Sequence, residues 1–373
     1  MESMGAVVFM EREGEAPSLL LEKVLFDPAA VWLAEALKEQ GVTRFLVVCH
    51  ADDRAAAADC FPQDTLFITN GAQEAARSSA FLNEMDTVIH LTKPLFPAGD
   101  EDAAQGAVRV SGEARRALQG MQPALTETSE GKGVSPVKGF VPLTRDALYE
   151  EIPAIAQARR ATQLRRAGVR VLDGQSTFVG PAVTVGRGTV LLPGTILRGK
   201  TSIGADCEIG PNTMIRDCTV GSGVTVNASQ LNESIVEDGA AIGPFAYVRP
   251  HCHVGREVKV GDFVELKNSV IGAGTKISHL TYVGDADVGE RVNFGCGTVT
   301  VNYDGDGKFR TVIGDDAFIG CNTNLVAPVQ VGAAAYTAAG STITQDVPPQ
   351  SLAIARAHQT VKKQWKNQRR ERK

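Results

Sequence analysis

Residues Val179-Gly-Pro-Ala-Val-Thr-Val185-Gly-Arg-Gly-Thr-Val-Leu191 open a repeat with a period of six residues. The aliphatic residue that begins each hexad returns without a miss at Val179, Val185, Leu191, Leu197, Ile203, Ile209 and Ile215. Neither an α-helix, with a period of 3.6, nor a simple alternating strand gives this spacing. It is typical of a parallel β-helix, in which each hexad forms a short strand and a corner and the aliphatic side chains stack inside. The sequence therefore predicts an all-β parallel β-helix here.

The repeat continues, with shifts of phase, as far as Ile343. One interruption stands out, at Asn302-Tyr-Asp-Gly-Asp-Gly-Lys-Phe-Arg310, which is polar and rich in glycine. A segment of this kind has to leave the wall of the coil. Insertions in repeat proteins gather on one face, often the binding face. We therefore expect binding residues near this insertion.

Residues ahead of the repeat predict a small α/β domain. Strand-like segments at 5–9, 44–49, 65–69 and 87–91 alternate with helical segments at 29–40 and 72–81, which favours a parallel sheet. Residues 97–139 are rich in Gly, Ala, Ser, Thr and Pro and predict a loop or a loosely ordered connection. A helix over 145–167, with a kink expected at Pro153, ends at Gly168. The predicted domains are 1–143 (α/β), 144–169 (connecting helix), 170–350 (β-helix) and 351–373 (C-terminal arm and basic tail).

Bulk composition excludes several classes of protein. The 373 residues give a prior of about two domains. With 43% hydrophobic and 22% charged residues and a net charge of −5, the chain resembles a soluble protein without a general attraction to nucleic acid. We expect no membrane insertion and no signal peptide, because no apolar run has the required length. Seven cysteines without a Cys-x-x-Cys pair argue against a disulfide framework, so the expected location is the reducing cytoplasm.

A few side chains could carry chemistry. His279 could act as a general base, or it could be a corner histidine with no role. Arg249 and Lys267 are eighteen residues apart, which is one coil of three hexads, so they should stack ~5 Å apart on one wall. Such a pair suits an anionic group such as phosphate, although a solvated surface pair has the same spacing. His251 and His253 resemble two metal ligands without a third, and no metal site is predicted.

Five motifs closely resemble one family, the bacterial bifunctional UDP-N-acetylglucosamine pyrophosphorylase/glucosamine-1-phosphate N-acetyltransferases. The resemblance covers roughly residues 140–366. It implies a left-handed β-helix and a homotrimer, two features that the repeat itself does not reveal. The motifs are Tyr247-Val-Arg-Pro250, Gly261-Asp-Phe-Val-Glu-Leu-Lys-Asn268, Ser278-His-Leu-Thr-Tyr-Val-Gly-Asp285, Val292-Asn-Phe-Gly-Cys-Gly-Thr298 and Asn302-Tyr-Asp-Gly305.

The resemblance also implies roles for individual residues. His279 matches the general base of the family. The phosphate-binding cations correspond to Arg249, Lys267 and Lys308, and the sugar-site residues to Tyr282 and Asn293. Positions that contact acetyl-CoA correspond to Cys296, Asn302, Tyr303, Cys321, Ala339 and Arg356. At two of these the chain departs from the family, since Cys296 stands where Ala is common and Cys321 where Ser is common.

The resemblance is much weaker before residue 140. The family follows its first strand with a Gly-x-Gly-Thr-x-Met loop that holds nucleotide phosphates, whereas here Val8 is followed by Phe-Met-Glu-Arg-Glu-Gly-Glu15. Carboxylates repel a triphosphate, and side chains block a close approach to the backbone. The metal-binding Asp of the family is also missing, replaced within Thr92-Lys93. These departures predict a degenerate nucleotidyltransferase-like (Rossmann-like) domain without pyrophosphorylase activity.

The resulting hypothesis is a glucosamine-1-phosphate N-acetyltransferase that uses acetyl-CoA, needs no metal and acts in UDP-N-acetylglucosamine and peptidoglycan (cell-wall) biosynthesis. Its active sites would lie at subunit boundaries of a cytoplasmic homotrimer. Three alternatives remain: an enzyme that is still bifunctional, a non-catalytic trimer that binds sugar phosphates, and a zinc hydratase of the γ-carbonic-anhydrase kind.

Overall fold

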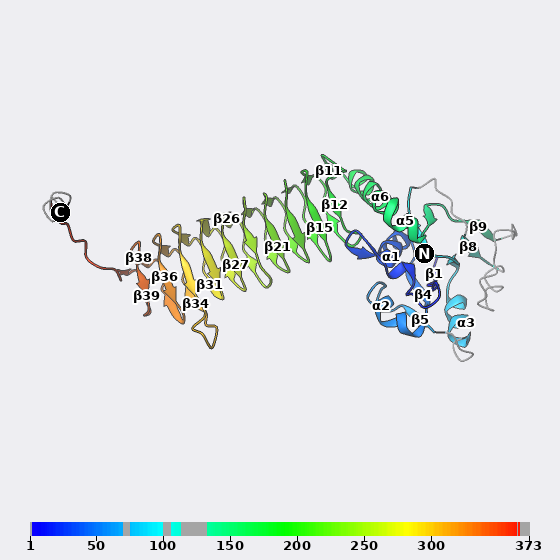
Figure 1. Ribbon diagram of the computed structural model, residues 1–373, viewed down its shortest axis with the longest axis horizontal. Helices are drawn as coiled ribbons and strands as arrows, with labels where there is room; N and C mark the ends of the chain where they lie inside the picture. The colour runs from blue at the N-terminus through cyan, green and yellow to red at the C-terminus, as the bar shows by residue number, and fades with distance from the viewer. Residues whose placement is uncertain (1, 70–74, 100–105, 113–132, 364, 366–373) are drawn as a thin grey trace, which may run out of the picture. The chain divides into compact units, whose positions relative to one another are not determined.

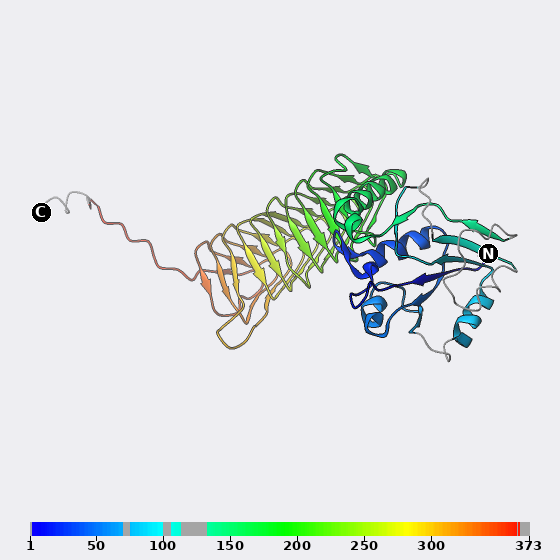
Figure 2. The ribbon, with the colours of Figure 1, turned by 45° about the vertical axis from the view of Figure 1, so that its right-hand side comes forward.

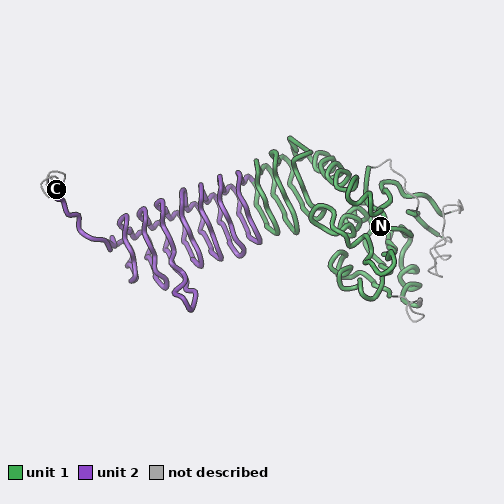
Figure 3. The backbone as a smooth tube through the Cα atoms, in the orientation of Figure 1, with its two compact units in different colours: residues 1–222 green, residues 223–373 purple. Residues whose placement is uncertain are grey.

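The computed structural model describes residues 2–69, 75–99, 106–112, 133–363 and 365. They divide into two compact units, residues 1–222 and 223–373 (Figure 3). The first unit contains a mixed α/β sheet, two connecting helices and the first coils of the repeat. The second contains the remaining coils. An N-terminal α/β region and a β-helix of hexapeptide repeats are both present, as the sequence predicts.

The α/β sheet has the strand order β5-β4-β1-β6-β8-β9. Strands β1 (Met4–Phe9), β4 (Arg44–Val48), β5 (Leu66–Ile68) and β6 (Thr87–Leu91) are parallel and match the four predicted strands. Strands β8 (Ala107–Ser111) and β9 (Val134–Pro136) are antiparallel. The prediction of a loop over 97–139 is therefore wrong for these two segments. Both are short, and antiparallel pairing with β6 determines their conformation more than local composition does.

The two faces of this sheet pack against different helices because successive residues of a strand point to opposite sides. Ala6 and Val8 join the cluster under α1 (Ala29–Glu39), whereas Val7 and Phe9 join the cluster under α3 (Ala75–Glu84). Figures 1 and 2 show these helices on opposite faces. The smaller elements of this region are η1 (Leu19–Leu21), β2 (Lys23–Val24), β3 (Asp27–Pro28), η2 (Ala51–Asp53), α2 (Arg54–Ala58), β7 (Leu95–Pro97) and β10 (Phe140–Pro142).

Two helices replace the single connecting helix that the sequence predicts. They are α5 (Arg145–Glu150), capped by the Thr144 hydroxyl that accepts from the Ala147 amide, and α6 (Ile152–Arg166). The break falls at Glu151, because Pro153 has no amide hydrogen and fits only the first turn of a new helix. Gly168, at φ +87°, follows the C-cap of α6 and allows the left-handed turn into the coil.

Each coil contributes one strand to each of three walls, and each wall is a parallel β-sheet. In the first unit the walls are β11 (Arg170–Val171), β14 (Val190–Leu191) and β17 (Glu208–Ile209); β12 (Phe178–Val179), β15 (Ile196–Arg198) and β18 (Met214–Arg216); and β13 (Thr184–Val185), β16 (Ser202–Ile203) and β19 (Thr219–Val220). The hexad aliphatics point inward as predicted, and all except the half-buried Val185 are buried.

The second unit repeats this plan. Its first wall contains β20 (Thr225–Val226), β23 (Ala241–Ile242), β26 (Lys259–Asp262), β29 (Lys276–His279), β32 (Asn293–Phe294), β35 (Phe318–Ile319), β38 (Tyr336–Thr337) and β40 (Leu352–Ala353). Its second wall contains β21 (Gln230–Asn232), β24 (Tyr247–Val248), β27 (Glu265–Lys267), β30 (Tyr282–Gly284), β33 (Val299–Val301), β36 (Asn324–Val326) and β39 (Thr342–Ile343). Its third wall contains β22 (Ile235–Val236), β25 (His253–Val254), β28 (Val270–Ile271), β31 (Ala286–Val288), β34 (Thr311–Ile313) and β37 (Val329–Val331).

Two further observations bear on the predictions from composition. None of the seven cysteines, all of which lie within the described residues, forms a disulfide. No helix in the described part of the chain is long and apolar enough to cross a membrane.

The buried His90 on β6 predicts an acid-sensitive fold. Burial lowers its pKa from 6.5 to about 4, so the unfolded chain takes up a proton first as the pH falls. Between pH 6.5 and 4 the native state should therefore lose up to about 3 kcal/mol of unfolding free energy. Urea unfolding at a series of pH values measures this slope. His90→Gln should reduce the slope, whereas the exposed control His358→Gln should keep it; equal slopes in all three proteins would contradict the assignment.

Candidate functional site

A pocket of about 370 Å³ lies beside the second wall of the second unit, and three cations line it. On the adjacent strands β24 and β27, Val248 is opposite Leu266, so Arg249 follows at the position next to Lys267. This is the stacking that the eighteen-residue spacing predicts. Lys308 reaches the same pocket from the insertion. The three cations, with the Asp285 carboxylate, are called the cation pocket below.

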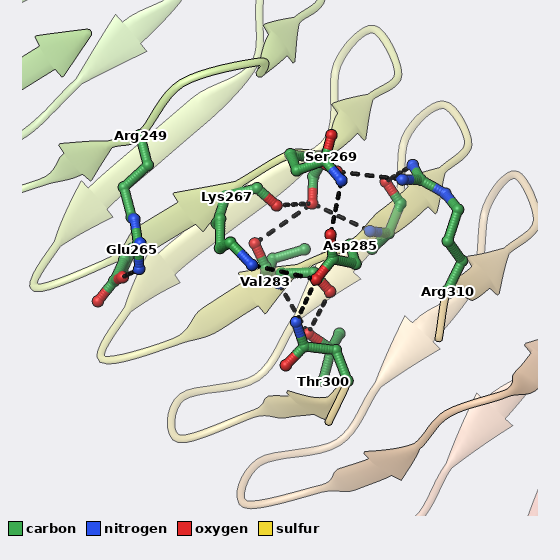
Figure 4. Close-up of polar contacts among 12 residues, drawn as sticks. Arg249, Glu265, Lys267, Ser269, Val283, Asp285, Thr300 and Arg310 are labelled. Atoms are coloured by element: carbon green, nitrogen blue, oxygen red, sulfur yellow. Dashed lines mark hydrogen bonds and ion pairs between the residues drawn. The ribbon is translucent and has the colours of Figure 1, made fainter. Parts of the chain in front are cut away.

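Carboxylates neutralise part of the charge of these cations (Figure 4). The Arg249 guanidinium donates to Glu265 at 2.8 Å, and the Lys267 ammonium donates to Asp285 at 3.3 Å. A hydrogen bond between the two lysine side chains, with Lys267 as the charged donor, raises the pKa of Lys267, and the ion pair with Asp285 raises it as well. The same hydrogen bond and the positive charge of Lys267 lower the pKa of Lys308. Two adjacent ammonium groups repel each other, so an anionic ligand between them would relieve the repulsion.

Asp285 connects the parts of the cation pocket, although it was not predicted as a site residue. It is 5% exposed and accepts hydrogen bonds from the side chains of Asn268, at 2.6 Å, Lys267 and Asn302. Burial raises the pKa of Asp285, but these hydrogen bonds outweigh burial and leave the pKa below its usual value. It follows Lys267 by eighteen residues, the regular coil length of the repeat, and this spacing was a signal that could have identified it.

The insertion leaves the coil and returns to it, as its composition predicts. Tyr303 and Lys308 form an isolated antiparallel bridge, and the Phe309 amide donates to the Asn302 carbonyl. Within the turn, the Asp304 carboxylate accepts from the amides of Asp306 and Gly307. Asn302 is buried at the base of the insertion, whereas Tyr303 is 58% exposed. The turn thus brings Lys308 back to the cation pocket.

A second group of predicted residues lies along one corner of the coils. The strand register places Asp262 opposite His279 and Ile277 opposite Phe294. It also places Phe294 opposite Ile319, and Ile319 opposite Thr337. Two residues further along each coil, the same register gives a column of neighbours one strand apart, about 5 Å. This corner column consists of Asp262, His279, Cys296, Cys321 and Ala339. The residues that follow His279, Cys296, Cys321 and Ala339 all have a positive φ, which turns the chain at each corner.

His279 is more than half exposed and its Nδ1 contacts the Asp262 carboxylate. This contact also lowers the pKa of Asp262. His279 does not line the cation pocket of its own chain. Gly284 is opposite Lys267 and follows His279 by five residues. The backbone path from His279 to Gly284 is therefore no longer than about 16 Å at ~3.3 Å per residue. Tyr282 lies between them on β30.

The remaining predicted residues have separate positions. The sequence did not show which wall carries Asn293. It lies on β32 opposite Lys276 of β29, so it is on the first wall, as is His279. Arg356 is exposed beyond β40. His253 contacts Glu237 at 2.7 Å, and His251 lines the cation pocket. Among the described residues, no cluster of three or more His, Cys, Asp or Glu side chains could hold a metal ion.

The segment after β1 contains a partly buried ion pair. Arg12 donates to both oxygens of Asp53, at 2.9 and 2.6 Å, and the Ser18 amide also donates to this carboxylate. The hydrogen bond from Arg12 holds the pKa of Asp53 below its usual value. Asp53 is only 3% exposed, so this interaction fixes the segment in place.

Removing the Asp285 carboxylate should loosen the insertion. Asp285→Ala leaves the donors of Asn268, Asn302 and Lys267 without their shared acceptor, which should cost about 1–3 kcal/mol of unfolding free energy. Hydrogen exchange of residues 302–310 should also accelerate. Asp287→Ala is the matched control, because its ion pair with Arg310 is about half exposed and should contribute less than about 1 kcal/mol. Equal effects of both substitutions would show that Asp285 has no special structural role.

Comparisons with known proteins agree with the motifs. Residues 310–345 match the family model "Bacterial transferase hexapeptide (six repeats)". The chain is similar to the bifunctional protein GlmU of Brevibacillus brevis (53% identity over 217 residues, 58% of this chain and 47% of the relative) and of Clostridium acetobutylicum (50% over 215 residues, 58% and 47%). It thus spans about half the length of these curated relatives.

Similarity to solved structures is lower. An Arabidopsis UDP-N-acetylglucosamine acyltransferase is 15% identical, with a TM-score of 0.36, and covers 50% of this chain and 70% of its own. This similarity is too low to bear on function. The GlmU alignments, by contrast, have about 50% identity over more than half of the chain and agree with the hexapeptide match. Over this matched part, the chain resembles the bifunctional GlmU proteins, in agreement with its loop motifs.

Proposed function

We propose that the chain is an acyltransferase, specifically a glucosamine-1-phosphate N-acetyltransferase that uses acetyl-CoA. The observation that carries the proposal is the corner column, in which His279 and three positions assigned to acetyl-CoA follow one another at intervals of one strand. The cation pocket supports it, because Arg249, Lys267 and Lys308 suit a phosphate. A thioester in the corner column would thus lie near the base that activates the acceptor.

In the proposed reaction, the cations bind the phosphate of the sugar, and this remote binding energy positions its amine. His279 takes a proton from the amine as the nitrogen attacks the thioester carbonyl. The new C–N bond forms, a backbone N–H stabilises the oxyanion, and the C–S bond then breaks to release CoA. Asp262 keeps the His279 ring in one orientation through Nδ1, which leaves Nε2 free to accept the proton.

The proposed active enzyme is a cytoplasmic homotrimer with active sites at subunit boundaries. The residues assigned to the sugar phosphate lie on two walls of a single chain, Asn293 on the first and Arg249 and Lys267 on the second. Tyr303 and Arg356 are exposed and available to a neighbouring subunit. Such an assembly allows a substrate to contact two chains at once.

The proposal also includes loss of the pyrophosphorylase activity of the N-terminal region. The Arg12–Asp53 ion pair after β1 supports it, because three glutamates and a fixed arginine occupy the segment expected to hold phosphates. Product detection by mass spectrometry, with acetyl-CoA and glucosamine 1-phosphate, tests the acetyltransferase. Adding N-acetylglucosamine 1-phosphate, UTP and Mg²⁺ tests the second activity through release of pyrophosphate. Binding of both substrates without product would instead favour a non-catalytic trimer.

His279 and Asp262 should differ in how strongly they affect turnover. His279→Ala should lower kcat by about 10²- to 10⁴-fold with little change in KM, because the base acts in the transition state. Asp262→Asn retains a side chain that can hydrogen-bond the ring and should lower kcat less than Asp262→Ala does. Steady-state kinetics at saturating acetyl-CoA measure these effects. Near-native turnover of His279→Ala would refute the base assignment.

Acetyl-CoA should protect two thiols. Cys321 is exposed and Cys296 is partly exposed, whereas the other five cysteines are buried. A thiol reagent should therefore modify Cys321 first, then Cys296, under native conditions. If the corner column holds the donor, saturating CoA should slow both reactions, as peptide mass spectrometry would detect. Cys321→Ser, which restores the residue common in the family, should remain active and lose the fast reaction. Unchanged rates with CoA would place the donor elsewhere.

A further inference from the structure

The first unit contains a pocket that the proposed acetyl transfer does not use. Its volume is about 730 Å³, within the range of sites for small molecules. The C-terminal end of α1, strand β9 with the residues after it, and one face of α6 surround it. Because the end of α1 leads directly into the start of β4, the pocket lies near the amino ends of the parallel strands. The segment after β1 leaves the sheet at the opposite, carboxyl ends.

The lining of this pocket is strongly basic. Four of its side chains are cationic: Arg109, Lys138, Arg159 and Arg166. Glu39 is the one carboxylate among the lining residues, and it already accepts hydrogen bonds from Arg159, at 2.7 Å, and from Gln163, at 2.7 and 2.9 Å. An anion would therefore meet a surplus of positive charge, while a cation would be repelled.

Arg109 is the residue that points to a ligand. It lies on β8 between the buried Val108 and Val110 and is opposite Ile89 of β6. Its Nε is buried and has no hydrogen-bond partner among the described residues. A buried guanidinium N–H without an acceptor is costly, and native proteins rarely leave one unsatisfied. The Nε is closed to solvent, so an anionic ligand would supply the missing acceptor by drawing the Arg109 guanidinium toward the pocket.

We propose that this pocket binds a phosphorylated small organic molecule. Arginine donors match the geometry of phosphate, which accepts two parallel hydrogen bonds from one guanidinium. The pocket is larger than an inorganic phosphate requires, and Val137, Ile155 and Ala158 offer an apolar surface for an organic part. Gln40, Ser135 and Thr162 supply polar groups for its hydroxyls. The site gives the N-terminal unit a binding function that is independent of nucleotidyl transfer.

Calorimetric titration tests the site in the full chain. The probes are AMP, UMP, glucose 6-phosphate and inorganic phosphate. The Arg249→Gln/Lys267→Gln background removes the contribution of the cation pocket. At least one organic phosphate should bind more tightly than inorganic phosphate. Arg109→Gln should weaken that binding by about 10- to 100-fold, the usual effect of losing a hydrogen bond to a charged group.

Three further variants separate binding from folding. Lys138→Gln, at an exposed position, should weaken binding without disturbing the sheet, so it covers the case in which Arg109→Gln does not fold. Glu39→Gln should strengthen binding, because it removes the negative charge. Arg54→Gln, exposed and outside the lining, should change nothing. The proposal is overturned if no organic phosphate binds better than inorganic phosphate. It is also overturned if neither Arg109→Gln nor Lys138→Gln weakens binding relative to the parent protein.

Discussion

The stacking of aliphatic side chains inside the coils is the interaction on which the candidate site depends. Leu231, Val248, Leu266 and Val283 lie at successive inward positions of one wall, and each is fully buried. Burying such a side chain contributes about 1.5–3 kcal/mol, and a shift of one residue would expose the whole set. The register is therefore fixed, and with it the neighbours of every outward residue. Arg249 lies next to Lys267 for this reason, and His279 next to Asp262.

The insertion after β33 depends on polar interactions instead. Its aromatic side chains, Tyr303 and Phe309, are exposed, so its position comes from hydrogen bonds at its two ends. Asn302 bonds to Asp285 at one end, and Arg310 contacts Asp287 and the Asn268 carbonyl at the other. These contacts bring Lys308 to a wall formed by residues about forty positions earlier. The cation pocket thus combines a rigid wall with a segment held by a few charged contacts, a combination that allows adjustment around a ligand.

The N-terminal α/β sheet follows a different principle, because helices cover both of its faces. Its parallel strands are like those of nucleotide-binding folds, yet the segment after β1 is held by the Arg12–Asp53 ion pair. The basic pocket beside Arg109 lies near the other ends of the strands. A fold can keep its core while the position of its ligand site changes, because burial constrains the core and only a few polar residues constrain a site.

The sequence alone determined the coils, the inward aliphatics, four strands and the main helix of the N-terminal sheet, and the stacking of Arg249 on Lys267. These features follow from strict periods, and a period fixes which residues are neighbours. Only the tertiary structure decided the rest: the antiparallel strands β8 and β9, the wall that carries Asn293, and the role of Asp285 as shared acceptor. Those features depend on pairing with distant segments and on phase shifts in the repeat. Local composition does not encode either of them.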